Sequence, residues 1–227
     1  EGKAIRGGVP VIFPQFSDFG ELVRHGFART AVWQLRQHGQ DVQGNAMAEL
    51  ELLANPATLA LWPYQFSLRF RVQANRQHLR LQLQVENTDS QAFSFSAALH
   101  SYFAVAELAQ ARLQGLQGVQ YLDNLQGRQC YIEDAAELTI QGEIDRVYQQ
   151  VPQALLLQQT DHRLRISQQG FTDAVIWNPG ASAANLSDME LAEAEHMLCV
   201  EAARIQQPVV LAAGASWQAE QVVEILL

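Results

Sequence analysis

The chain has 227 residues, and 15 lysine and arginine residues against 24 aspartate and glutamate residues give it a net charge of -9. This acidic balance argues against binding to nucleic acid, where basic side chains must neutralise the phosphate backbone. No apolar run has the length of a membrane span, and the first residues lack the apolar segment of a signal peptide. We therefore expect no nucleic-acid partner, no membrane partner, and one domain over residues 1–227.

The two cysteines, Cys130 and Cys199, lie in neither a CxxC motif nor a histidine-containing spacing typical of zinc sites. Two such residues do not make a disulfide framework. The sequence therefore predicts a reduced, cytoplasmic protein with no metal site.

Alternating apolar and polar residues predict two neighbouring strands, at 66–73 and 79–85. Each strand has one apolar and one polar face, and the short connection at 74–78 favours an antiparallel hairpin. Turn-forming residues at 86–91 then precede a long apolar run at 92–105.

Further short runs have strand-like composition. Only residues 186–197 have a pattern that favours a short helix. Many short strands separated by turns predict an all-β, antiparallel β-sandwich. The runs lie at 111–123, 136–142, 154–159, 162–170, 173–180, 197–205 and 217–226.

Two titratable side chains lie in apolar, strand-like sequence. His100 interrupts the run 97–105, and Glu201 follows an apolar stretch at 197–200. A buried histidine is either a core residue held by a carbonyl group or a functional group, and a buried carboxylate is costly unless it is paired. Together they are a candidate acid and base pair.

Arginine and histidine side chains gather near the start of the chain. Arg6 precedes a pair of glycines, which allow the backbone to approach a ligand closely, and a second cationic segment lies at 24–29. This second segment is either a solvated surface cluster or an anion site, since guanidinium groups match phosphate and carboxylate. It contains Arg24, His25 and Arg29.

Eight segments follow one another in order from about Gly2 to the C-terminus: GKAIRGGVPVIFPQF, HGFAR, ALHSYFAV, GLQGVQYLD, EIDRVY, DAVIWNPG, CVEAA and PVVLAAGASWQAEQ. In this order they resemble the D-hexose-6-phosphate mutarotases, the glucose-6-phosphate 1-epimerases of the aldose 1-epimerase superfamily. The resemblance implies a galactose-mutarotase-like β-sandwich, or supersandwich. It also implies an isomerase that interconverts the α and β anomers of a hexose 6-phosphate, with no cofactor.

The resemblance also implies roles for individual residues. The histidine of the family's LH-S/T-YF motif falls on His100 as general acid, and the glutamate of its CVE motif falls on Glu201 as general base. The aspartate of DRVY falls on Asp145, expected at the sugar hydroxyls, although Asp145 beside Arg146 is also compatible with an ion pair on a turn. The arginines of RGG and HGFAR fall on Arg6 and Arg29, expected at the phosphate and the sugar, with His25 close by.

The chain departs from the family pattern in several places. Arg24 stands where many relatives have glutamine, which favours stronger phosphate binding or a changed hexose preference. Gly180 stands where an aromatic residue is common, which implies a missing stacking wall for the sugar. Asp173 is interpreted as structural, and the strands that precede the RGG segment in the family are expected to be absent.

Two alternatives stay open from the sequence. An aldose 1-epimerase that acts on unphosphorylated sugar needs His100 and Glu201 but not the arginines. A non-catalytic carbohydrate-binding sandwich needs aromatic platforms, although tryptophans at strand-like positions more often pack in the core. The candidates are Trp33, Trp62, Trp177 and Trp217. In either case we expect a monomer that binds a sugar.

Overall fold

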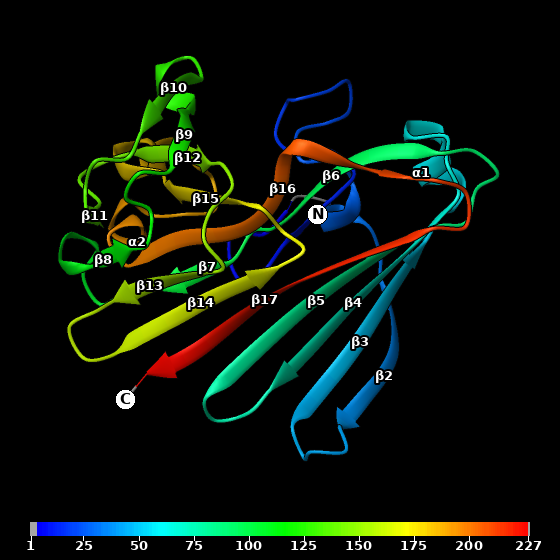
Figure 1. Cartoon of the computed structure of the whole chain (residues 1–227), viewed down its shortest axis with the longest axis horizontal. Helices are drawn as coiled ribbons and strands as arrows, with labels where there is room; N and C mark the ends of the chain where they lie inside the picture. The colour runs from blue at the N-terminus through cyan, green and yellow to red at the C-terminus, as the bar shows by residue number, and fades with distance from the viewer. Residues whose placement is uncertain (1–3, 227) are drawn as a thin grey trace.

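Two antiparallel β-sheets pack against each other in the computed structural model, which describes residues 4–226 (Figure 1). The first sheet runs in the order β1 (Val11–Ile12), β6 (Phe93–Leu99), β16 (Met197–Leu211), β15 (Asp173–Asn178), β12 (Ile144–Tyr148), β9 (Gln120–Asp123) and β10 (Gln129–Ile132). A further short strand, β7 (Tyr102–Ala104), also pairs with β16. The predicted all-β, antiparallel fold is confirmed.

The second sheet runs in the order β11 (Glu137–Thr139), β8 (Arg112–Gln114), β13 (Ala154–Gln158), β14 (Arg163–Gln169), β17 (Ser216–Leu226), β5 (His78–Asn87), β4 (Phe66–Ala74), β3 (Ala46–Leu53) and β2 (Gln34–Gln40). In Figure 1 its strands β2 to β5 lie side by side with β17 and β14. The predicted hairpin at 66–85 is the β4–β5 pair, in which Phe70 lies opposite Leu83.

Helical segments are short and lie between strands. They are α1 (Pro56–Leu61), α2 (Leu191–Ala194), and the 3-10 helices η1 (Ala28–Thr30), η2 (Leu108–Gln110), η3 (Asn124–Gln126) and η4 (Gly180–Asn185). The helix expected within 186–197 is reduced to α2. In α1, which the strand pattern did not predict, Asn55 caps the first turn by accepting hydrogen bonds from the backbone N–H groups of Ala57 and Thr58.

Two of the predicted continuous runs are divided. The run 92–105 breaks between Leu99 and Tyr102, where the backbone N–H of Ser101 donates to the carbonyl of Leu99 instead of to β16. The run 111–123 divides into β8 and β9, which belong to different sheets. Of the strands in residues 4–226, five lie outside the predicted runs, namely β1, β2, β3, β10 and β12.

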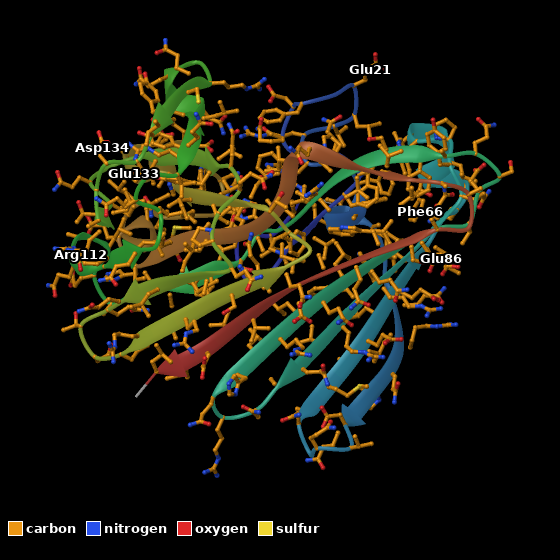
Figure 2. The ribbon with its side chains drawn as sticks, viewed as in Figure 1. Glu21, Phe66, Glu86, Arg112, Glu133 and Asp134 are labelled. Atoms are coloured by element: carbon orange, nitrogen blue, oxygen red, sulfur yellow. The ribbon has the colours of Figure 1, made fainter. Side chains whose placement is uncertain are left out.

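The core between the sheets consists of two clusters of buried apolar side chains. The first includes Phe66, Leu83 and Leu99, and the second includes Leu157 and Val200, so both contain residues of each sheet. Figure 2 shows the side chains that fill this space, with Phe66 labelled among them. One face of the first sheet is therefore fixed against the second sheet, which leaves the other face for a site.

Cys130 and Cys199 are both free, as predicted, and Cys199 is buried. Trp33, Trp62 and Trp217 pack against the first core cluster, as expected for core residues. Among residues 4–226, no helix is both long and apolar enough to cross a membrane.

Candidate active site

Strand register places His100 and Glu201 opposite each other. On β6 and β16, Leu99 pairs with Ala202, and on β7 and β16, Tyr102 pairs with Cys199. His100 and Ser101 lie between these pairs on one segment, and Val200 and Glu201 lie between them on β16. His100 therefore faces Glu201. The imidazole Nε2 of His100 lies 3.3 Å from Oε1 of Glu201.

Burial disfavours the charged forms of both side chains. Desolvation raises the pKa of the Glu201 carboxyl well above its usual range, and the nearby Asp145 carboxylate adds to this effect. Desolvation also lowers the pKa of His100 to about 3, and the positive charge of Arg29 contributes in the same direction. The remaining atoms, His100 Nδ1 and Glu201 Oε2, are buried without a hydrogen-bond partner among the described residues.

A pocket of about 990 Å³ opens over this pair. Its walls come from the loops before and after β1, from β12, β15 and β16, and from the segment that joins η4 to α2. The structure thus brings every predicted site residue to one pocket. Those residues are Arg6, Arg24, His25, Arg29, His100, Asp145 and Glu201.

The loop that follows β1 carries the cationic cluster, and it projects from the sheet with the exposed Glu21 at its outer end (Figure 2). It returns through His25 and Gly26, which both have left-handed backbone conformations, with φ of 68° and 66°. A Cβ atom at Gly26 would lie 2.2 Å from the carbonyl oxygen of Phe13, so only glycine fits there. This close approach brings His25 and Arg29 back over the sheet.

His25 is held inside the loop. Its Nδ1 accepts a hydrogen bond from the backbone N–H of Ser17 at 3.3 Å, and its ring lies edge-on to that of Phe16. The ring centroids of His25 and His100 are 5.9 Å apart. Desolvation lowers the pKa of His25 to about 3, with a further contribution from Arg29. Burial therefore favours the neutral form of both histidines in the pocket without substrate.

The three arginines of the pocket are held differently. Arg6 forms an ion pair with Asp188, from the segment between η4 and α2. Arg29, in η1, donates from Nη2 to the carbonyl of Arg24 at 2.9 Å, and desolvation lowers the pKa of its guanidinium. Three cationic side chains in one pocket form a site suited to an anion.

Asp145 points into the pocket from β12. Asn124 Nδ2 donates to its Oδ1 at 2.7 Å, and burial raises the pKa of this carboxyl. The guanidinium of Arg146, the next residue, instead contacts Asp123 and Glu133. Successive residues of a strand point to opposite faces, so the interpretation of Asp145 and Arg146 as an ion pair on a turn is wrong.

Two aromatic side chains line the pocket, of which Tyr102 was not predicted and Trp177 was a candidate only for the non-catalytic sandwich. The ring of Tyr102 stacks on the imidazole of His100, with centroids 4.8 Å apart and an angle of 9° between the planes. Trp177 lies edge-on to both rings and also lines the pocket. The pocket therefore has an aromatic wall despite Gly180, and Tyr102 was detectable because it follows His100 at the alternate position of a strand.

Asp173 has a structural place, as predicted. It is completely buried, and its Oδ2 accepts hydrogen bonds from the backbone N–H groups of Ile205 and Gln206 at 2.8 and 2.9 Å. These contacts join β15 to β16 beyond Glu201. Within residues 4–226, no group of three or more His, Cys, Asp or Glu side chains has an arrangement suited to a metal ion.

Comparison with known proteins gives a match over almost the whole chain. Residues 2–224 match the family described as aldose 1-epimerase. A protein of Cenchrus ciliaris named "Putative glucose-6-phosphate 1-epimerase" is 34% identical over 228 residues, which cover 95% of this chain and 69% of that protein. A protein of Escherichia coli K12 with the same name is 30% identical, over 89% of this chain and 68% of its own length.

Solved structures of similar proteins have the same fold. A crystal structure from Salmonella typhimurium, described as a "putative mutarotase", superposes with a TM-score of 0.90 at 27% identity, over 99% of this chain and 75% of that chain. A galactose mutarotase-like protein of Lactobacillus casei gives a TM-score of 0.76 at 17% identity, over 96% and 85%, and shows the likeness of fold alone. The predicted galactose-mutarotase-like sandwich is confirmed, and the chain belongs to the aldose 1-epimerase family.

Proposed function

We propose that this protein interconverts the α and β anomers of a hexose 6-phosphate, with His100 and Glu201 as the acid and base. The observation that carries the proposal is the 3.3 Å approach of these two side chains in a pocket that also contains Arg6, Arg24 and Arg29. The similarity to proteins named glucose-6-phosphate 1-epimerase supports the phosphorylated sugar as substrate.

Ring opening needs one proton removed and one proton supplied. Glu201 takes the proton of the anomeric hydroxyl while the bond between C1 and the ring oxygen breaks, and the imidazolium of His100 protonates that oxygen. The product is the open-chain aldehyde, with a neutral carboxylic acid and a neutral imidazole beside it. Rotation about the C1–C2 bond followed by the reverse transfers closes the ring to either anomer, so protons and electrons balance over the cycle.

The burial of the pair favours this chemistry. In the reactive form of the complex one proton lies on His100 and Glu201 is ionised, whereas after ring opening both side chains are neutral. Desolvation lowers the pKa of His100 to about 3 and raises that of Glu201, so the low-dielectric site favours the neutral state of the pair. Ring opening from the reactive form is therefore favoured, because it converts the charged pair to the neutral pair.

The arginines have a second effect besides binding. Arg29, Arg6 and Arg24 all lower the pKa of His100 through their positive charge. A bound phosphate dianion offsets these charges and makes protonation of His100 easier, which prepares the imidazolium that ring opening requires. Asp145 and the aromatic wall formed by Tyr102 and Trp177 are proposed to hold the sugar itself.

The test is exchange NMR of the anomeric protons of glucose 6-phosphate, with and without the protein, beside the same measurement on free glucose. We expect faster exchange for the phosphate ester and little change for glucose. Faster exchange for glucose alone, or equal acceleration of both sugars, would contradict the phosphate assignment and favour an aldose 1-epimerase for unphosphorylated sugar. No acceleration of either sugar by a folded sample would contradict catalysis.

A further inference from the structure

We infer that Gln221 is a positioning residue for the reaction, because its buried amide joins the residues next to His100 and Glu201 from the second sheet. The inference rests on the proposed function, since it concerns the geometry of that acid and base. Gln221 lies on β17 and is 1% exposed. It does not line the pocket.

The amide of Gln221 makes two hydrogen bonds across the sandwich. Its Nε2 donates to the carbonyl of Val200 at 3.0 Å, and its Oε1 accepts from the hydroxyl of Ser101 at 2.5 Å. The backbone N–H of Val200 in turn donates to the carbonyl of Ser101 at 3.2 Å. These three bonds form a closed network.

The network sits behind the reacting pair. Ser101 directly follows His100, and Val200 directly precedes Glu201. Successive strand residues point to opposite faces, so His100 and Glu201 face the pocket while Ser101 and Val200 face the second sheet. One side chain on that sheet therefore fixes the backbone on both sides of the 3.3 Å contact between His100 and Glu201.

This support replaces one ladder bond that the first sheet lacks at this point. The pairing of β6 with β16 stops at Leu99, and the pairing of β7 with β16 begins at Tyr102. Between them, the N–H of Ser101 donates to the carbonyl of Leu99 rather than to β16, and the carbonyl of Val200 accepts from Gln221 instead. Without the Gln221 amide, the hydroxyl of Ser101 and the carbonyl of Val200 lose a partner, and only the bond from the N–H of Val200 to the carbonyl of Ser101 still joins these two residues.

A polar side chain at this position needs a specific reason. Ala219 and Val223, two residues away on the same face of β17, pack with the first and second core clusters respectively. An amide in such surroundings is costly unless its groups are hydrogen-bonded, and an apolar residue would fill the space at lower cost. A glutamine at position 221 is therefore better explained by the hydrogen bonds of its amide to Ser101 and Val200 than by core packing.

The test compares Gln221→Met with Asn87→Leu, each of which replaces a buried amide by an apolar side chain of similar size. Asn87 is a matched control because it is fully buried and donates to the carbonyls of Gln91 and Leu211, which do not line the pocket. For both variants and the wild type, kcat and KM for glucose 6-phosphate and the thermal midpoint are measured.

We expect both variants to unfold at a lower temperature, and only Gln221→Met to lose kcat, by about tenfold or more with KM unchanged, since small displacements of reacting groups are costly. Ser101→Ala removes one bond of the network and serves if Gln221→Met does not fold. Ser101→Ala should lower kcat by less than Gln221→Met does. The double variant should lose no more kcat than Gln221→Met alone, because both substitutions break the same network.

Wild-type kcat in folded Gln221→Met, or an equal loss of kcat in Asn87→Leu, would overturn the inference while leaving the proposed function intact. In contrast, a folded wild-type protein that does not accelerate anomer exchange would overturn the proposed function, and this inference with it.

Discussion

Arg6 and Asp188 form an ion pair that joins two loops on the exposed side of the pocket, where their side chains are 34% and 36% accessible. One loop precedes β1, and the other connects η4 to α2. A substrate phosphate that binds Arg6 must therefore compete with a carboxylate of the protein itself.

This competition predicts that Asp188→Asn binds the phosphorylated substrate more tightly. Removing the carboxylate frees Arg6, and because partly exposed ion pairs are weak, we expect KM for glucose 6-phosphate to fall by about two- to fivefold. The measurement is steady-state kinetics at low ionic strength and again at high ionic strength, where screening should reduce the difference. A higher KM in the variant would show that Asp188 instead contacts the substrate favourably.

Arg29 should contribute to binding of the phosphate ester. A hydrogen bond between charged groups is worth roughly 1.5–3 kcal/mol, so Arg29→Met should raise KM for glucose 6-phosphate by about ten- to a hundredfold. Arg163→Met is the matched control, because Arg163 is an exposed arginine on β14 outside the pocket. Equal changes of KM in the two variants would contradict a contact between Arg29 and the substrate phosphate.

Glu201→Gln should abolish most of the activity and leave the fold intact. Glu201 is 1% exposed, and glutamine keeps its shape while it cannot accept the anomeric proton. We expect kcat to fall by about a hundred- to ten-thousandfold, as for other positioned acid or base groups. Calorimetry should still detect binding of glucose 6-phosphate, and circular dichroism should match the wild type. Full activity in this variant would exclude Glu201 as the base.

His25 should make the folded protein sensitive to acid. Its folded-state pKa is about 3, against 6.5 for an ordinary histidine, so between these values the unfolded chain binds a proton that the folded chain does not. The contribution of His25 to the free energy of unfolding is therefore fully present above pH 6.5 and is lost as the pH falls toward 3.

The variant His25→Asn tests this effect, because asparagine tolerates the left-handed backbone at this position and can accept the hydrogen bond from Ser17. Thermal midpoints of both proteins are compared from pH 7 to pH 4. The wild type should lose stability more steeply than the variant over this range. His100 and Glu201 titrate in both proteins, so the difference between the two curves reports His25, and parallel curves would contradict the assigned pKa.

The sequence was most informative where apolar and polar residues alternate. The β4–β5 hairpin followed directly from that pattern, because each strand buries one face. Strand β2 lacked such a signal, since every residue in it is exposed. Strand β3 contains alternating Glu49, Leu50, Glu51 and Leu52, so its sequence does have the pattern of a strand. Helix α1 was marked by Asn55 followed by proline, a capping signal that strand periodicity does not capture.

The members of the site were predictable, whereas its geometry was not. Motif order identified His100, Asp145 and Glu201, but a linear pattern does not determine which strands are neighbours. Their proximity depends on β6, β7, β12 and β15 pairing around β16 in one register. Asp188 carried no local signal because it lies in an irregular segment, and its role becomes visible only through its contact with Arg6.

The opposed positions of His100 and Glu201 also determine when the site can form during folding. The two residues are separated by roughly a hundred positions in the chain, and such distant contacts are slow to close because the intervening loop must first lose entropy. The β4–β5 hairpin is local and can form early. In refolding from denaturant, the far-ultraviolet signal of the sheets should therefore recover before anomer exchange does, which makes the enzymatic assay a measure of completed assembly rather than of secondary structure.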